Sequence, residues 1–441
     1  MSGTQGIHTF LPGKPMKMAK TLPNIHRGEH SINILAFAHG TSLGGAQVST
    51  IEFFELLRDQ VSLRVIVCED VDAEFAHQLR LLNIEFRTRP CYWRGNLPHM
   101  DVSGMEDWIK WADVAWITDI EFSVAPRVKR VRKFPVVAHL HSYPLLCPWW
   151  GLLFGMREVC YEGCSLSRIV RCKQVFNEEL SRLGILSGFR KSAYQALDLV
   201  KGPLDYLCWR KVVNRGLIDS IDGFIAVSNF VKRVHETLLP VEGKPIEVVY
   251  NPVTYPLKYV MDSKPRENQG GNPIVYASGS NPVKGPHLAL QALKLLLNEG
   301  LNVKLVMFGC RGSWVEEYAR KLRVERSVIF SGRESLARLY ETISTASVVV
   351  MPSIVPESFG RIPVEANRLG VVAVVTNRGG LPETVVHGET GYVATPYPDD
   401  IAKWLLRALE GTRGEVVKER SLKTINPQAS VNKLLGFLIK F

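Results

Sequence analysis

The sequence predicts an α/β protein of two doubly wound, Rossmann-like domains, and three observations lead to this prediction. Short runs of β-branched residues alternate with amphipathic stretches from about residue 32 onward. The alternation stops at residues 263–273, which are rich in charge, Gly and Pro, and then begins again. The length of 441 residues suits two or three domains. Strand and helix in turn are typical of a parallel sheet with crossover helices.

The first series predicts an N-terminal domain over residues 31–244. We expect strands at residues 32–38, 62–68, 113–118, 134–141 and 223–227, with helices after residue 50 and at 75–83. An insertion over about residues 145–215 interrupts the series, because apolar side chains recur there at helical spacing. Residues 1–30 have no such pattern and are expected to form a loose basic tail.

The second series predicts a C-terminal domain over residues 245–410. We expect strands at 273–279, 302–309, 327–330, 347–353, 371–376 and 391–395, and helices at 287–297, 314–322, 336–343 and 359–369. Residues 411–441 are expected to form a helical segment that crosses back to the N-terminal domain. Two such domains place the carboxyl ends of their sheets, where ligands usually bind, on either side of one cleft.

Residues 136–156 lack charged side chains and are long enough to span a bilayer, but they contain Pro144, Pro148, His139 and His141. Prolines and imidazoles make a poor spanning helix, so we expect a buried strand and an aromatic loop. The first 30 residues contain no apolar signal segment. Eight cysteines without such a signal favour a reducing cytoplasm, with free thiols as the default.

The net charge of +11 is distributed unevenly. Residues 245–410 hold 18 basic and 16 acidic side chains, whereas residues 165–215 hold 10 basic and 4 acidic ones. No nucleic-acid reader motif accompanies the charge, so we expect no nucleic-acid partner. Our hypothesis is that the basic, apolar insertion meets an anionic membrane, with the protein peripheral at its inner face. An ordinary solvated helical cover over the first sheet explains the same pattern.

The most informative stretch is residues 352–366, where a Val-rich strand ends and a helix begins. Glu357 and Glu365 are eight residues apart, which places one at the helix mouth and the other further along. Backbone N–H groups at a helix start suit a phosphate or hydroxyl ligand. A simpler interpretation is that Glu357 caps its own helix and Glu365 is a solvated face residue.

ESFGRIPVE at residues 357–365 resembles the E-x7-E signature of retaining glycosyltransferases of family 4, which have the two-domain B-type (GT-B) fold. Further motifs follow the family's order along the chain, and together they cover residues 34–396. They are LGGA at 43–46, VVAHLHSYPLLCP at 136–148, FIAVSNFVK at 224–232, VVYNPV at 248–253, PVKGPHLALQAL at 282–293, LVMFG at 305–309 and GGLPE at 379–383. The resemblance implies transfer of a sugar from a nucleotide-diphosphate sugar, with retention and without a required cofactor or catalytic metal.

The resemblance also implies roles for residues. Glu357 would contact hydroxyls of the donor sugar beside Ser358 and the N–H groups of Phe359 and Gly360, and Glu365 would accept from the ribose. Ionised carboxylates suit these tasks because they make strong, charge-assisted hydrogen bonds. His141 would face the sugar and acceptor from the other domain, although a histidine at a strand end is more often a packing residue.

Lys284 is the candidate cation for the donor diphosphate, because a positive group where charge develops stabilises the transition state. The family usually has an arginine after the preceding glycine, but here Ser280 follows Gly279. We therefore expect Arg311 or Arg361 to replace that guanidinium. Lys284 as an ordinary surface lysine is the alternative.

Two glycine pairs fit loops that approach a ligand closely, Gly44 with Gly45 and Gly379 with Gly380. Glu383 follows the second pair and is either a donor-side residue or a first-turn helix acid. The dinucleotide fingerprint GxGxxG and the Walker motif are absent from the sequence.

Four cysteines in the insertion, Cys147, Cys160, Cys164 and Cys172, have the spacing C-x12-C-x3-C-x7-C. Four thiolates suit a structural zinc ion, but the usual C-x2-C knuckles are missing, so buried free thiols are the alternative.

The leading functional prediction is a retaining glycosyltransferase acting on a glycan or lipid-linked acceptor. Two alternatives remain on the same fold. One is a catalytically silent protein that binds a sugar nucleotide or glycan, which the missing arginine would allow. The other is a nucleotide-sugar epimerase, which would need no acceptor.

Overall fold

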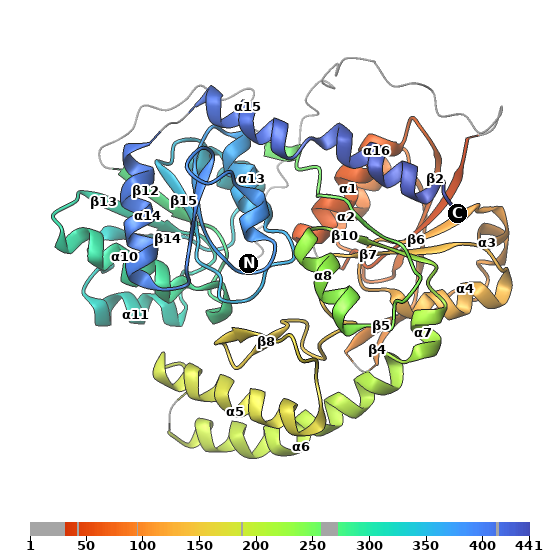
Figure 1. Cartoon of the computed structure of the whole chain (residues 1–441), viewed down its shortest axis with the longest axis horizontal. Coiled ribbons are helices and arrows are strands. Elements are labelled where there is room, and N and C mark those ends of the chain that lie inside the picture. The colour runs from red at the N-terminus through yellow and green to blue at the C-terminus, as the bar shows by residue number, and fades with distance from the viewer. Residues whose placement is uncertain (1–30, 42–43, 95, 187, 257–271, 412–413) are drawn as a thin grey trace, which may run out of the picture.

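The computed structural model describes residues 31–41, 44–94, 96–186, 188–256, 272–411 and 414–441. Its described part contains two large parallel β-sheets in separate domains, with helices on their faces (Figure 1). This confirms the predicted pair of Rossmann-like domains. The predicted tail at 1–30 and most of the predicted linker lie outside the described residues.

The N-terminal sheet has seven parallel strands in the order β11-β10-β7-β6-β1-β2-β3. The residues of the five inner strands are mostly buried, as expected for a sheet covered on both faces, whereas the edge strands are more exposed. The strands are β1 (Asn33–Ala38), β2 (Ser62–Cys68), β3 (Glu85–Arg89), β6 (Val114–Ile117), β7 (Val136–Leu140), β10 (Gly223–Ala226) and β11 (Ile246–Val248). Because β11 pairs with β10, this domain extends beyond the predicted boundary at residue 244.

Helices connect these strands, and a small hairpin that the sequence patterns did not indicate follows β3. The helices are α1 (Gly45–Leu57), α2 (Ala73–Leu81), α3 (Glu106–Trp111), α4 (Ala125–Val131), α7 (Arg215–Asp219) and α8 (Asn229–Leu238). The hairpin pairs β4 (Cys91–Arg94) with β5 (Leu97–Met100), and a short 3-10 helix, η1, covers Phe122–Val124. Helix α1 begins at Gly45, earlier than predicted, because the Gly-rich loop leads directly into it.

The insertion contains a short hairpin, β8 (Leu153–Phe154) with β9 (Glu158–Val159), and two long helices, α5 (Leu166–Arg182) and α6 (Gly188–Val212). The two helices pack side by side and run beneath both domains (Figure 1). Phe176 and Leu180 of α5 pack against the C-terminal core, whereas Trp209 of α6 belongs to the N-terminal core. The insertion therefore bridges the two domains.

The C-terminal sheet has six parallel strands in the order β14-β13-β12-β15-β16-β17. They are β12 (Asn272–Tyr276), β13 (Val303–Met307), β14 (Val328–Phe330), β15 (Val348–Met351), β16 (Ala373–Thr376) and β17 (Gly391–Ala394). The helices are α10 (Pro286–Asn298), α11 (Trp314–Leu322), α12 (Leu336–Ser344), α13 (Arg361–Arg368) and α14 (Pro398–Glu410), with 3-10 turns η2 (Pro282–Lys284), η3 (Glu325–Ser327) and η4 (Leu381–Thr384). Every strand and helix predicted for residues 273–395 is present.

The last two helices, α15 (Glu415–Thr424) and α16 (Pro427–Leu438), cross from the C-terminal domain back to the N-terminal one (Figure 1). Val431 and Leu434 of α16 join the core that includes strands β1 and β2, and α16 contacts α1. The two helices thus link the C-terminal domain to the N-terminal one.

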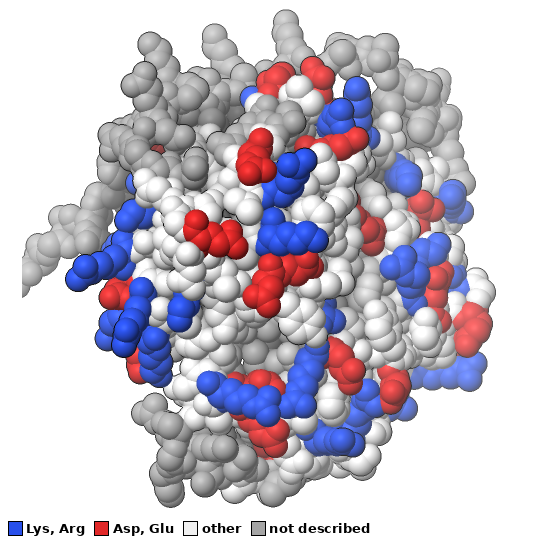
Figure 2. Space-filling model, turned by 60° about the vertical axis from the view of Figure 1, so that its left-hand side comes forward, with Lys and Arg blue, Asp and Glu red and all other residues white. Residues whose placement is uncertain are grey.

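Two surface properties bear on the sequence predictions. Figure 2, which turns the C-terminal domain toward the viewer, shows basic and acidic side chains interspersed, consistent with the near balance of charge at 245–410. Among the described residues, no helix combines the length and apolar character needed to cross a bilayer. Residues 136–156 instead form β7 and an irregular loop that leads into the β8–β9 hairpin, as predicted.

Candidate active site

Lys284 and Glu357 form an ion pair at the carboxyl ends of the adjacent strands β12 and β15. Lys284 Nζ lies 2.7 and 2.9 Å from the two oxygens of Glu357, and Ser353 Oγ donates to one of them at 2.7 Å. Glu357 lies in the loop before α13, and its side chain is 11% exposed. None of these contacts is the predicted capping of α13 by the Glu357 side chain. The carboxylate is instead held by side chains from two strand ends, where ligands of such sheets usually bind.

Glycines at positive φ allow the backbone approaches that build this pair. Gly285, at φ 73°, packs so closely on β15 that a Cβ would lie 2.0 Å from the carbonyl oxygen of Pro352. Gly379, at φ 65°, pairs with Glu357, and a Cβ there would lie 2.1 Å from the Glu357 carbonyl oxygen. The glycines of the NPVKG and GGLPE motifs are therefore required sterically beside Lys284 and Glu357.

Arg361 and Glu365, on successive turns of α13, lie at the contact between the two domains. Arg361 Nε donates to Glu365 at 3.0 Å, and Arg361 Nη1 donates to Glu52 of α1 at 2.6 Å and to Ser49 at 2.7 Å. Glu52 also accepts from the backbone N–H groups of Thr254 and Tyr255. Burial opposes the charge of Arg361, but the two carboxylates outweigh it and raise its pKa.

These contacts bear on two predictions. Glu52 and Glu365 balance the charge of Arg361 through Nε and Nη1, whereas its Nη2 is buried without a hydrogen-bond partner among the described residues. That Arg361 replaces the missing guanidinium therefore stays a prediction. Glu365 is not a solvated face residue, because its side chain is 5% exposed and paired with Arg361. Arg311 is exposed after β13, and its Nε donates to the carbonyl of Phe330 at 3.2 Å. Of the two arginines considered, Arg311 is the accessible one.

His141 directly follows β7 and brings an uncharged imidazole to the domain boundary. Burial, and then the charge of Arg361, lowers the pKa of His141 to about 3. Its ring lies 4.3 Å from that of His139, centroid to centroid. Within the described chain, His141 Nε2 and the hydroxyl of Tyr143 are buried without a hydrogen-bond partner. Burial and then the charge of Glu357 raise the pKa of Tyr143, which places this hydroxyl within electrostatic reach of the Glu357 carboxylate.

The glycine loop and the start of α13 meet across the two domains. A Cβ on Gly45 would lie 3.3 Å from Arg361 Cδ, so the loop packs on that side chain, and Gly44 precedes α1 as its N-cap. Ser228 Oγ donates to the carbonyl of Ser358 at 2.6 Å. Phe359 is buried in the N-terminal core, and Gly360, at φ 91°, is the N-cap of α13. The structure therefore brings the glycine loop of the N-terminal domain next to Arg361 of the C-terminal domain.

Glu383 has a role that the sequence did not indicate. Its carboxylate accepts from the backbone N–H groups of Asn229 and Phe230, both at 2.9 Å or less, and from the hydroxyl of Tyr250 at 3.0 Å. It thus caps helix α8 of the other domain, where a negative charge is favoured by the helix dipole. Glu383 also lies in the first turn of η4, so the alternative of a first-turn helix acid is confirmed, and the capping of α8 is a further contact.

A second polar cluster, missed at the sequence level, follows strands β1 and β6 of the N-terminal sheet. His39 Nδ1 lies 3.0 Å from Glu121, and Gln47 donates to Asp119 at 2.8 Å. Burial and then Glu121 raise the pKa of Asp119 to about 8, whereas for His39 the contacts with Glu121 outweigh burial and raise its pKa. The sequence feature that could have indicated this cluster is the position of its polar residues, because AHG and TDIE both lie at the ends of predicted strands.

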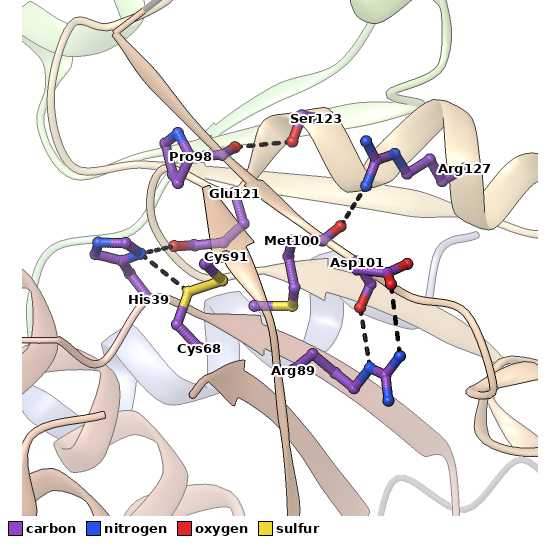
Figure 3. The surroundings of a disulfide bond; sticks show 10 residues. All are labelled: His39, Cys68, Arg89, Cys91, Pro98, Met100, Asp101, Glu121, Ser123 and Arg127. Atoms are coloured by element: carbon purple, nitrogen blue, oxygen red, sulfur yellow. Dashed lines mark hydrogen bonds and ion pairs between the residues drawn. A yellow bond between two sulfur atoms is a disulfide. The ribbon is translucent and has the colours of Figure 1, made fainter. Parts of the chain in front are cut away.

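A disulfide between Cys68 and Cys91 borders this second cluster, and Figure 3 shows His39 between Glu121 and the Cys68 sulfur. The disulfide joins the end of β2 to the start of β4 in the β4–β5 hairpin. At the end of β5, Arg127 donates to the Met100 carbonyl and Arg89 pairs with Asp101. The expectation of free thiols is therefore wrong for these two cysteines. The other six, including the four of the insertion, are free.

Comparison with known proteins agrees with this arrangement. Residues 43–255 match the sequence profile of glycosyltransferase family 4, and residues 260–423 match that of the glycosyl transferases group 1. The chain is 29% identical over 221 residues to the lipopolysaccharide 1,2-N-acetylglucosaminetransferase of Salmonella typhimurium, covering 46% of this chain and 58% of the relative. It is 27% identical over 184 residues to N-acetyl-alpha-D-glucosaminyl L-malate synthase of Bacillus anthracis, covering 40% and 47%.

These matches span about half the length of the curated relatives. Over nearly the whole chain, the fold is similar to that of HepE from Anabaena, solved in complex with UDP. The TM-score is 0.64 at 16% identity, and the match covers 93% of this chain and all of that one. With one profile matching each domain and two facing parallel sheets, the chain belongs to the family 4 glycosyltransferases of the GT-B fold.

Proposed function

We propose that the protein transfers a sugar from a nucleotide-diphosphate sugar to a glycan or lipid-linked acceptor, with retention and without a catalytic metal. The observation that carries the proposal is the Lys284–Glu357 pair at the ends of β12 and β15. It lies within electrostatic reach of the unpartnered hydroxyl of Tyr143 on the other domain. A cation and a carboxylate side by side suit a ligand that has phosphate next to hydroxyls.

In this proposal Lys284 contacts the diphosphate, because an ammonium has three donors and can serve Glu357 and a phosphate oxygen together. Its charge would stabilise the leaving group as the glycosidic bond breaks. Glu357 accepts from hydroxyls of the sugar, beside the N–H groups of Phe359 and Gly360. Arg311 is the accessible guanidinium for the phosphates. Glu365, which hydrogen-bonds to Arg361 and Tyr340, would accept from the ribose through remaining lone pairs of its carboxylate.

His141 and Tyr143 would face the sugar and the acceptor. Since the His141 imidazole is neutral, it can donate to a hydroxyl without adding charge to the site. A buried polar atom without a partner costs free energy, so its pairing with a ligand hydroxyl would favour binding. Two unpartnered polar groups facing the site suit a transferase, which must hold two substrates, better than a protein that only binds sugar nucleotides.

The test is a panel of UDP, GDP and ADP sugars with candidate acceptors. We expect one donor to raise the melting temperature, because a ligand stabilises the state that binds it. With an acceptor, nucleotide diphosphate should be released, and the product should keep the donor's anomeric configuration by NMR. Donor binding without turnover would favour a catalytically silent binding protein. Conversion of the donor in the absence of an acceptor would favour an epimerase. A product with inverted anomeric configuration would contradict retention. Activity that depends on added Mg²⁺ or Mn²⁺ would contradict metal independence.

We further propose that α6 places the protein on an anionic membrane, where a lipid-linked acceptor would lie. Four apolar side chains spaced three or four residues apart are 52–63% exposed on this helix: Leu197, Val200, Leu204 and Leu207. Lys201, Arg210 and Lys211 are exposed on the same helix. An apolar row with basic residues nearby is typical of a helix that lies in the membrane interface.

Vesicle flotation tests this surface. We expect binding to vesicles with anionic lipid, and Arg210→Gln should weaken it about fivefold, since a basic residue near the surface contributes about 1 kcal/mol. Leu204→Gln should also weaken binding, whereas Leu81→Gln, equally exposed at 55% on α2, should not. Binding that does not depend on anionic lipid would contradict the membrane role.

A further inference from the structure

The four free cysteines of the insertion converge on one small cavity. Cys147 follows β7, Cys160 follows β9, Cys164 precedes α5 and Cys172 lies in its second turn. All four line the same cavity of about 20 Å³, whose other walls include Trp149, Leu152, Phe154 and Ile169. Segments up to 25 residues apart are thus folded so that their cysteines line one cavity.

Backbone N–H groups are directed at two of these sulfurs. The N–H groups of Trp149, Gly151 and Leu152 donate to Cys147, and that of Gly155 donates to Cys172 Sγ at 3.4 Å. These donors come from the loop after Cys147 and from the β8–β9 hairpin, so the backbone is folded around both sulfurs.

The loop accepts an uncommon backbone to achieve this geometry. Trp150, Leu152 and Met156 all have positive φ, at 62°, 45° and 60°. Each such residue costs about 1–2 kcal/mol for a side chain other than glycine. A Cβ at Gly155, also at positive φ, would lie 2.3 Å from Val175, so the hairpin is pressed against α5.

The sulfurs lie within electrostatic reach of one another. Cys164 interacts electrostatically with Cys147, Cys160 and Cys172. Four thiolates in one cavity repel one another, and a bound cation reverses that repulsion. Arg168 lies beside Cys160 and Glu162, so it supplies a positive charge at the edge of the cluster.

We propose that Cys147, Cys160, Cys164 and Cys172 bind one zinc ion in a closed, tetrahedral, structural site. Thiolates in a set of four select zinc or iron. A cavity of about 20 Å³ has room for a single ion. Of the described residues, only His39, Cys68 and Glu121 have ligand atoms all within 4.8 Å of one another, and Cys68 is in a disulfide. Zinc would therefore draw the four thiolates closer, to about 2.3 Å from the metal.

The zinc ion would join the insertion to both domains. Cys147 lies four residues after Tyr143, on the loop that leaves the candidate active site. The carbonyl of Arg157, in the β8–β9 turn, accepts from Arg378 of the C-terminal domain at 3.1 Å. Met156 of the same turn belongs to the C-terminal core. The site thus fastens a hairpin that contacts the donor-side domain next to Gly379.

Elemental analysis of the purified chain, prepared under reducing conditions, tests the site. We expect about one zinc per chain, since structural sites hold zinc tightly. The same content is expected for Cys208→Ser, which removes an exposed free cysteine of α6, and for Cys310→Ser. Cys164→Ser should lose most of the zinc.

A spectroscopic measurement on the unmodified chain keeps the proposal testable if Cys164→Ser does not fold. Zinc-edge X-ray absorption should give four sulfur neighbours at about 2.3 Å. Zinc below roughly 0.2 equivalents would overturn the proposal, given the affinity of such sites. Iron with sulfide, a nitrogen or oxygen shell in place of sulfur, or peptide maps with disulfides among these four cysteines would also overturn it. None of these readouts depends on glycosyl transfer.

Discussion

Glu357→Gln is expected to lower kcat/KM for the donor by about 100- to 1,000-fold, the usual cost of removing one preorganised polar group from a reacting centre. The carboxylate holds Lys284 with both oxygens and accepts from Ser353. The amide of glutamine keeps one acceptor but loses the charge, so both the placement of the ammonium and the acceptance of sugar hydroxyls should weaken. Initial-rate kinetics of nucleotide diphosphate release measures the change.

Stability provides the internal control for Glu357→Gln. The melting temperature should stay close to that of the unmodified protein, because Ser353 can still donate to the amide oxygen. Glu317→Gln, on the exposed face of α11, should leave both kinetics and melting unchanged. Lys284→Ala should also lower kcat/KM, and Arg311→Ala should do so to a smaller extent. If Glu357→Gln and Lys284→Ala both had full activity, the proposed site would be wrong.

Arg361→Met is expected to reduce the free energy of unfolding by about 3–5 kcal/mol, because it leaves Glu52 and Glu365 as buried carboxylates without a counter-charge. The side chains of Arg361, Glu52 and Glu365 are 7%, 0% and 5% exposed, so water cannot compensate. Arg361 joins α13 to α1 in the other domain, and the loss should therefore weaken the contact between the domains. Denaturant unfolding followed by tryptophan fluorescence measures it.

A double-mutant cycle separates this pair from general packing. Arg361→Met combined with Glu52→Gln should cost less than the sum of the single substitutions, since the double variant removes both charges of one ion pair. Arg407→Met is the matched control, because Arg407 pairs with Glu410 on the exposed face of α14 and should cost below about 1 kcal/mol. Equal effects of Arg361→Met and Arg407→Met would contradict a buried interdomain pair.

The C-terminal domain was the part most fully predictable from the sequence. Its strands are short runs of Val, Ile and Met between turn residues, and its helix α11 was predicted with the observed bounds, Trp314–Leu322. The β4–β5 hairpin was not predicted, because CYWR and LPHM show no clear apolar alternation, and their pairing depends partly on the disulfide to Cys68. A disulfide joins residues far apart in the chain, and the local sequence pattern around each cysteine does not indicate which partner it has.

In the candidate site, too, some features could be predicted from the sequence and others could not. The sequence by itself determined the fold class, the strand ends that carry Lys284, Glu357 and His141, and the glycines beside them, because these follow from local pattern and motif spacing. Only the tertiary structure decided that Arg361 serves an interdomain ion pair, that Glu383 caps α8 and that four distant cysteines share one cavity. The physical reason is that these roles depend on charges and thiols brought together from segments far apart in the chain, and burial then makes their pairing obligatory.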